Sequence, residues 1–199
     1  MDALNYGVVT PFLPQRATDL GASEFDVTAI YAAYAAGLIL FTLPSGIFSD
    51  RLGRRPVIMA GGFGLAASTL VFAFADSVWL LAASRFLQGI AGALWWTPSL
   101  AVIADLYPAS QRGAKMGLAM SITAGGDLLG PVFGGALTEL GSYRLPLLVI
   151  VAVSAITAVA FGAVYRKTER AAKEQRPSLT STLLHPAVVM LCATALLAA

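Results

Sequence analysis

The chain has 199 residues, of which 57% are hydrophobic and 12% are charged, and its 13 Lys and Arg nearly balance its 11 Asp and Glu. Soluble domains carry about 25% charged residues, so this composition excludes a soluble domain, and the small net charge excludes a nucleic-acid-binding protein. One cysteine and one histidine exclude an internal disulfide and a metal site built from those residues, and we expect no cofactor. The composition therefore indicates an integral membrane protein.

Five apolar stretches are long enough to cross a membrane as helices. A spanning helix needs about 20 mostly apolar residues, because each residue rises about 1.5 Å across a hydrocarbon core of about 30 Å. Three of the stretches contain no charged residue, and the other two contain one each, Arg85 and Asp127. In chain order, the predicted spans are 27–49, 56–75, 77–104, 116–138 and 145–165.

Two shorter apolar stretches, 3–15 and 186–199, lie at the ends of the chain. Neither is long enough to cross a membrane, so we expect the first to end a helix that begins upstream and the second to start another helix. The predicted fold is therefore all-α and integral to the membrane. A bundle of six helices, the first truncated, occupies 1–165, a cytoplasmic linker occupies 166–186, and the start of a seventh helix occupies 187–199.

Basic residues predict the orientation of the helices. Ten of the 13 Lys and Arg lie in three alternate connections, whereas Arg16 and Arg144 lie on the opposite side and Arg85 lies within a span. Cytoplasmic connections carry the excess of Lys and Arg, so we expect these three connections and the N-terminus to be cytoplasmic. No enzyme is expected, because the other connections are short and no nucleophile is paired with a base. The basic connections are 49–56, 105–115 and 166–177.

Arg85 and Asp127 are charged residues inside predicted spans. A charge near the bilayer centre costs about 2.5–3.5 kcal/mol on insertion scales, so such a residue normally faces protein or a water-filled cavity. A carboxylate there can also take up and release a proton as its surroundings alternate between wet and dry. We predict a role in proton coupling for both residues, and for Asp2 if the first helix extends upstream. The alternative is a buried ion pair that only fixes helix packing.

Two further patterns suit close packing or a cavity. Gly126, Gly130 and Gly134 recur every fourth residue, which lets another helix approach closely, and Pro131 bends the helix between them. Aromatic and polar side chains also recur at helical spacing in 27–49 and around Arg85. Such residues often serve packing alone, but we predict that some line a substrate cavity. The predicted cavity residues are Tyr31, Tyr34, Gln88 and Trp96.

A glycine-rich and basic motif joins the first two of these spans. Asp50 can accept hydrogen bonds from backbone amides or from a nearby Arg, and the glycines permit a tight turn. The motif resembles the signature loop between helices two and three of the major facilitator superfamily, whose pattern is G-x-x-x-D-R-x-G-R-R. Its residues are Gly46, Asp50, Arg51, Gly53, Arg54 and Arg55.

Three further segments resemble motifs of the same superfamily in order and spacing. Residues 85–89 are similar to its fourth-helix motif, whose Arg is linked with proton transfer. Residues 5–14 are similar to the first-helix motif of its drug–proton antiporter branch. The span 116–138 resembles the fifth-helix motif of its antiporters, in which the position of Asp127 is left free. The residues of this antiporter glycine motif are Gly117, Gly126, Gly130, Pro131, Gly134 and Gly135.

The resemblance also implies a conformational mechanism. Asp105 and Arg112 stand where the superfamily's second cytoplasmic loop supplies partners for Asp50 and Arg54, and this cluster would latch one state of the transporter. The superfamily fold has two six-helix halves with the substrate cavity between them, so this chain resembles the N-terminal half. Its implied partners are the lipid bilayer, protons, a small-molecule substrate and the missing C-terminal half.

The expected function is secondary active transport by alternating access. We expect proton-coupled efflux of lipophilic or cationic molecules across a plasma membrane or a bacterial inner membrane. One alternative is a symporter or exporter of sugars or organic anions, in which Arg85 would bind the substrate. Another is a truncated fragment or a half-size subunit that does not transport by itself.

Overall fold

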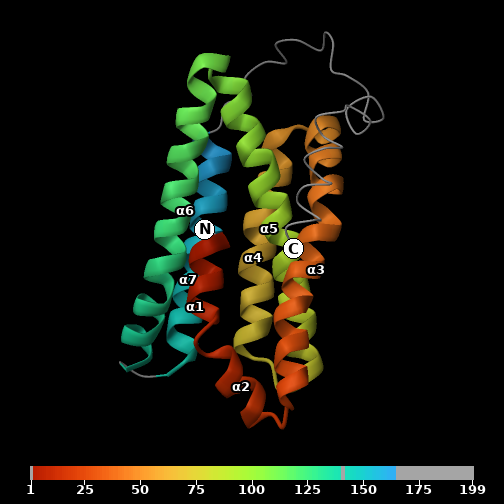
Figure 1. Cartoon of the computed structure of the whole chain (residues 1–199), viewed down its shortest axis with the longest axis vertical. Coiled ribbons are helices and arrows are strands. Elements are labelled where there is room, and N and C mark those ends of the chain that lie inside the picture. Colours follow the sequence, from red (N-terminus) through yellow and green to blue (C-terminus); the bar gives the residue numbers. More distant parts are fainter. Residues whose placement is uncertain (1, 140–141, 165–199) are drawn as a thin grey trace, which may run out of the picture. The chain divides into compact units, whose positions relative to one another are not determined.

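The computed structural model describes residues 2–139 and 142–164, which fold into helices joined by short connections. Figure 1 shows the longer helices side by side in one bundle. The predicted linker, 166–186, and the predicted start of a seventh helix, 187–199, lie outside the described residues.

Five of the described helices are long and apolar enough to cross a membrane. Each overlaps one predicted span over most of its length, which confirms the five spans. Large apolar side chains cover their outer faces, and Ile39 (72% exposed), Leu128 (75%) and Ile156 (66%) are examples that suit contact with lipid. The five helices are α3 (Glu24–Leu52), α4 (Arg54–Ala73), α5 (Val78–Leu106), α6 (Ala109–Glu139) and α7 (Arg144–Val164).

The first apolar stretch forms two helices, α1 (Asp2–Val9) and α2 (Leu13–Asp19), where the sequence predicted the end of a single one. Pro11 explains the interruption, because it has no N–H to donate and disfavours helical geometry at the residue before it. The chain still turns in the helical sense, since the Thr10 N–H donates to the Tyr6 carbonyl at 3.0 Å. The result is a bend between α1 and α2.

The predicted connection 105–115 is mostly helical, and this boundary prediction was wrong. Only Tyr107 and Pro108 separate the end of α5 from the start of α6. The apolar run ends where polar residues such as Gln111 and Lys115 begin, but these residues form helix readily outside the membrane. Hydropathy therefore located the end of the apolar run rather than the end of the helix.

The two ends of α3 are set by local sequence. At its start, the Ser23 hydroxyl accepts the Asp26 N–H at 3.2 Å, and the Ser23 N–H donates to the Asp26 carboxylate at 2.9 Å. This reciprocal capping satisfies two N–H groups that have no partner within the helix. At its end, Gly53 has a φ of 96°, which favours glycine and turns the chain directly into α4.

Small residues let α3 and α5 pack with their backbones nearly in contact. A Cβ added at Gly89 would collide with the Tyr34 carbonyl oxygen, and one added at Gly37 would collide with the Phe86 carbonyl oxygen. The other extensive interfaces join α4 to α5, α4 to α7 and α1 to α6. These contacts fix the positions of Tyr34 and Arg85, which lie beside the contact points.

The glycine stripe of α6, which consists of Gly126, Gly130 and Gly134, packs against α1. A Cβ added at Gly130 would lie 2.7 Å from the Cα of Gly7. The two helices, which lie side by side in Figure 1, therefore touch through backbone atoms. This close approach also brings Asp127 next to α1, since a Cβ added at Gly7 would lie 3.0 Å from the Asp127 carbonyl oxygen.

The Gly130→Ala variant should lower the thermal stability of the purified protein by about 1–3 kcal/mol, because the new methyl group meets backbone atoms of α1 that cannot move alone. Gly135→Ala is the matched control in the same helix, since no described neighbour lies within 4 Å of its added Cβ. Gly117 is equally open. Thermal unfolding in detergent, followed by size-exclusion chromatography, compares the variants. Equal losses of stability at positions 130 and 135 would contradict the packing described.

Candidate functional site

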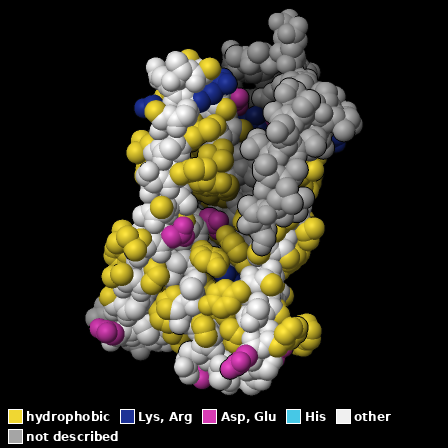
Figure 2. All heavy atoms as spheres, in the orientation of Figure 1, with side chains coloured by type: hydrophobic (Ala, Val, Ile, Leu, Met, Phe, Trp, Pro, Cys, Tyr) yellow, Lys and Arg dark blue, Asp and Glu magenta, His cyan; other side chains and the backbone are white. Residues whose placement is uncertain are grey.

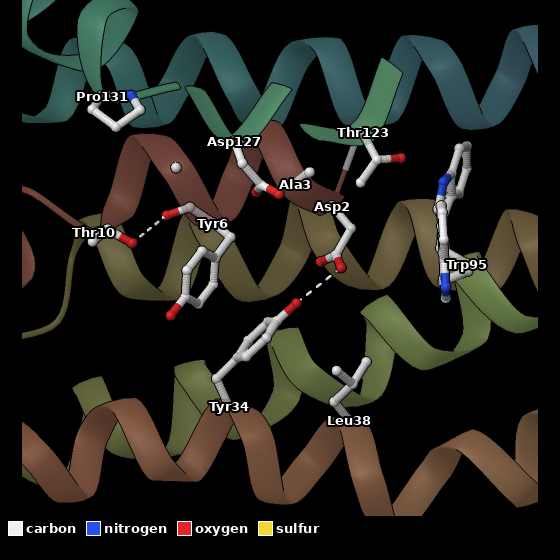
Figure 3. A pocket seen from close by; sticks show the side chains of 12 residues that line it. Asp2, Ala3, Tyr6, Thr10, Tyr34, Leu38, Trp95, Thr123, Asp127 and Pro131 are labelled. Carbon is white, nitrogen blue, oxygen red and sulfur yellow. Dashed lines mark hydrogen bonds between the residues drawn. The ribbon is translucent and has the colours of Figure 1, made fainter. Parts of the chain in front are cut away.

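A cavity of about 470 Å³ opens between α1, α3, α5 and α6. Its walls combine carboxylate and hydroxyl groups with aromatic rings and small apolar side chains, as Figure 3 shows. A concave site with a few polar groups among apolar ones suits a small molecule. The lining residues are Asp2, Ala3, Tyr6, Gly7, Thr10, Tyr34, Leu38, Trp95, Trp96, Thr123, Asp127 and Pro131.

Two carboxylates line this cavity from neighbouring helices. Asp2 on α1 accepts a hydrogen bond from the Tyr34 hydroxyl on α3 at 2.8 Å. Asp127 on α6 is exposed, and in Figure 3 its side chain points toward the space beside α1. Figure 2 shows acidic side chains at mid-height on a face that is otherwise largely apolar. The fold thus brings together two acids that lie 125 residues apart in the sequence.

Arg85 lies behind the cavity wall with 0% of its surface exposed. Its guanidinium group donates to the Gln88 amide oxygen at 2.9 Å. Three tyrosine rings surround it, with centroids 4.7 Å (Tyr34), 5.0 Å (Tyr6) and 6.0 Å (Tyr31) from its central carbon. Aromatic faces attract a cation, so these rings stabilise a charge that has left water.

A chain of buried hydrogen bonds continues from Arg85 to α4 and α1. The Gln88 amide donates to the Thr69 hydroxyl at 3.1 Å, and the Asn5 amide donates to the same hydroxyl at 2.8 Å. Asn5 and Thr69 are 2% and 0% exposed. Because buried polar groups need partners, this chain fixes α1, α4 and α5 around the arginine.

The predicted cavity residues divide into two sets. Tyr34 and Trp96 line the cavity. Gln88 and Tyr31 are not among its lining residues, and they lie beside Arg85 instead, with the Tyr31 hydroxyl donating to the Thr10 carbonyl at 2.9 Å. Sequence reasoning missed further residues of the site, Thr10 and Leu38 among them. A polar residue in an apolar run, as at position 5, is a usable signal. Other missed residues are Asn5, Tyr6, Thr69, Trp95 and Thr123.

The alternative of an ion pair between Arg85 and Asp127 finds no support. The salt bridges among residues 2–139 and 142–164 join Arg54 to Asp50 and to Asp105, and none involves Arg85. Arg85 is held by an amide and by tyrosine rings, and Asp127 keeps its carboxylate at the cavity surface.

Arg54 is the centre of a cluster at the end of the bundle where α3 meets α4. It donates to the Asp50 carboxylate at 2.6 Å, to the Ser49 hydroxyl at 2.6 Å and to the Asp105 carboxylate on α5 at 3.2 Å. We call these four residues the latch cluster. Its contacts join the α3–α4 turn to the end of α5, as the sequence motif predicted for Asp50, Arg54 and Asp105.

The other residues of the predicted latch loop, including the predicted partner Arg112, do not take part in these three contacts of Arg54. Arg112 donates to the Tyr107 carbonyl at 3.0 Å, a contact between the start of α6 and the connection before it. Arg51 and Arg55 are exposed. The nearest neighbour of a Cβ at Gly46 would be the Thr97 methyl group at 3.9 Å, an ordinary contact between α3 and α5.

Comparison with known proteins decides the family. The model of the Major Facilitator Superfamily matches residues 1–199. The chain belongs to this superfamily. The resemblance found in the sequence motifs is thereby confirmed, and so is the all-α membrane fold. The superfamily and the relatives described next are transporters rather than enzymes.

Several superfamily members are similar to the chain over most of its length. The MFS-type transporter ppzB of Metarhizium rileyi is 34% identical over 79% of the chain and 32% of its own length. The human vesicular acetylcholine transporter is 33% identical over 82% of the chain and 31% of its own length. The class B tetracycline resistance protein of Escherichia coli is 32% identical over 85% of the chain and 42% of its own length. The chain thus spans about a third of the length of such superfamily relatives.

Proposed function

We propose that this chain forms one half of the transport path of a secondary active transporter that moves small molecules by alternating access. The observation that carries the proposal is the open cavity of about 470 Å³, with two carboxylates and a set of aromatic rings in its walls. Membership of the Major Facilitator Superfamily supports it. The latch cluster would hold the helices in one of the two states.

The cavity favours lipophilic or cationic substrates. Its walls carry the acidic side chains of Asp2 and Asp127 and none of its described lining residues is basic, and the rings of Trp95 and Trp96 offer faces that attract cations. A relative named for acetylcholine supports this class, because acetylcholine carries a quaternary ammonium group. The relative named for tetracycline resistance supports export as the direction.

Proton coupling would act at the cavity carboxylates. When a carboxylate beside the buried Arg85 takes up a proton, the positive charge of Arg85 loses its compensating negative charge. An uncompensated charge among apolar helices is costly, so protonation would favour the other conformation of the transporter. The excess of Lys and Arg in 49–56 and 105–115 favours the cytoplasmic side of a plasma membrane or bacterial inner membrane for the latch cluster and for the N-terminus.

The proposal is tested with the protein expressed from its full reading frame and reconstituted into lipid vesicles. We expect an imposed pH gradient to drive the cationic dye ethidium across the membrane, and a protonophore to stop this flux. The control is vesicles without protein under the same gradient. If the rate of ethidium flux is the same with and without the pH gradient, the proposed proton coupling is wrong. If no compound of a panel of cationic and neutral molecules crosses the membrane faster than in vesicles without protein, the proposed transport activity is wrong.

A second candidate is transport of organic anions, with Arg85 as the binding residue. One observation favours it: the Nε and Nη2 atoms of Arg85 are buried without a hydrogen-bond partner among the described residues, so they could donate to an anion. Another opposes it, because the Arg85 side chain is 0% exposed and an anion in the cavity would not reach it. The two cavity carboxylates would also repel an anion. Proton-driven flux of an anionic dye in the same vesicles, with none of ethidium, would favour this candidate.

A further inference from the structure

The two carboxylates of the cavity have different surroundings. We propose that Asp127 binds the cationic group of the substrate and that Asp2 is reserved for the proton. This division of roles rests on the proposed function and refines it, because it assigns the substrate and the proton to separate residues on α6 and α1.

One oxygen of Asp2, Oδ1, faces away from the open space of the cavity. The Asp2 carboxylate packs against α5 so closely that a Cβ added at Gly92 would lie 2.9 Å from Oδ1. Its other oxygen, Oδ2, accepts the Tyr34 hydroxyl at 2.8 Å. Oδ1 is buried and has no hydrogen-bond partner among the described residues. A proton can add to Oδ1 without displacing any atom, whereas an alkylammonium group cannot reach it.

Asp127 has the space that Oδ1 of Asp2 lacks. Its side chain is exposed at the cavity surface, and within the described part of the chain it makes no hydrogen bond or salt bridge. Thr123, one turn earlier on α6, also lines the cavity and adds a hydroxyl beside the carboxylate. A cation that enters this space meets a free carboxylate first.

The opposite wall fits the rest of such a ligand. Tyr34 and Leu38 on α3 and Trp95 on α5 line the cavity away from α6, as Figure 3 shows. Indole and phenol rings attract organic cations through their faces and also bury apolar groups. The ligand class is therefore a lipophilic organic cation, with its charged group near Asp127 and its apolar groups near the rings.

The closeness of Asp2 and Asp127 also couples binding of the substrate to release of the proton. The charged and titratable groups that face Asp2 within the described residues are Tyr34 on α3, Arg85 on α5 and Asp127 on α6. An empty Asp127 repels a second negative charge, so a proton on Asp2 is favoured. A cation bound at Asp127 cancels this repulsion, and we expect its binding to release a proton.

The test measures binding and proton release with one probe, tetraphenylphosphonium, on the purified protein expressed from its full reading frame. Calorimetry in two buffers of different ionisation enthalpy gives the affinity and the number of protons released. Asp127→Asn should weaken binding about tenfold or more, the loss of one charged contact. Asp2→Asn should abolish proton release and make the affinity independent of pH, because the neutral amide resembles the protonated acid at every pH. Glu139→Gln, an acid-to-amide change about three turns away on the same helix, is the matched control.

The outcomes separate this inference from the proposed function. If the wild-type protein binds and transports tetraphenylphosphonium but Asp127→Asn keeps full affinity, the division of roles is overturned and the transport proposal stands. If Asp2→Asn weakens binding about tenfold even at acid pH, where the wild-type carboxyl group is already neutral, while Asp127→Asn keeps its affinity, the assignment is reversed. If Asp127→Asn does not fold, Asp127→Glu replaces it, because its longer side chain moves the carboxylate within the cavity. If this variant binds tetraphenylphosphonium and a bulkier cation with the same affinities as the wild type, the inference is contradicted. Failure of the wild-type protein to bind or transport any cation overturns both proposals.

Discussion

Replacing Arg85 with methionine should reduce proton-driven transport by at least about 100-fold, because the variant removes the positive charge that faces Asp2, the proposed proton carrier, and losing one buried charge interaction of about 3 kcal/mol corresponds to this factor. The side chain is 0% exposed and is held by Gln88 and three rings, so the charge cannot be supplied by a neighbouring residue. Flux of a cationic dye in vesicles under a fixed pH gradient measures the effect.

Arg85→Lys refines this prediction. Lysine keeps the positive charge but lacks the planar guanidinium group that stacks on rings and donates in a fixed geometry, so we expect an activity between those of the wild type and Arg85→Met. Arg144→Met is the matched control, since the Arg144 guanidinium also lies near an aromatic ring, 5.1 Å from the Phe74 centroid, but Arg144 is exposed at the start of α7. Equal losses in Arg85→Met and Arg144→Met, at equal amounts of inserted protein, would refute a special role for Arg85.

The second large effect is expected at the latch cluster. Arg54→Gln should destabilise the protein by about 1–3 kcal/mol and reduce transport about tenfold, because one side chain holds Ser49, Asp50 and Asp105 together. The range is at the low end for three charged contacts, since the carboxylates are 49% and 44% exposed and water screens them. Thermal unfolding in detergent and dye flux in vesicles measure the two effects.

A neighbouring arginine gives the comparison for this prediction. Arg55 belongs to the same sequence motif and is exposed, whereas only 13% of the Arg54 side chain is accessible. Arg55→Gln should therefore have a clearly smaller effect than Arg54→Gln, while Asp50→Asn, which removes one of the partners, should fall between them. If the two arginine variants behaved alike, the motif would act through its net charge rather than through the contacts of Arg54.

The helices could be predicted well from the sequence, and their boundaries less well. Apolar length is a direct physical requirement of a membrane, so all five long helices were found. Helix ends depend on backbone hydrogen bonds, which hydropathy does not report. For this reason the sequence missed the bend at Pro11, although proline there is a visible signal, and it placed a loop where α6 already begins at Ala109.

The site was only partly predictable. The contact of Arg54 with Asp105 followed from a motif whose residues act together. The surroundings of Arg85 did not follow, because they depend on how α1, α3 and α4 are rotated about their axes, and no single stretch of sequence specifies that. Thr69 illustrates the problem: one threonine among apolar residues carries no signal until Asn5 and Gln88 are seen to share its hydroxyl.

Pro98 gives α5 a pivot between the substrate and the cytoplasmic surface. Proline donates no backbone hydrogen bond, so the Leu94 carbonyl has no N–H partner one turn later, and the helix is softest there. Trp95 and Trp96 contact the cavity immediately before this point, and Asp105 contacts Arg54 about two turns after it. A bend of α5 at Pro98 would move the segment that carries Asp105 relative to Arg54, so the tryptophan end and the Asp105 end of this helix can change their relative angle.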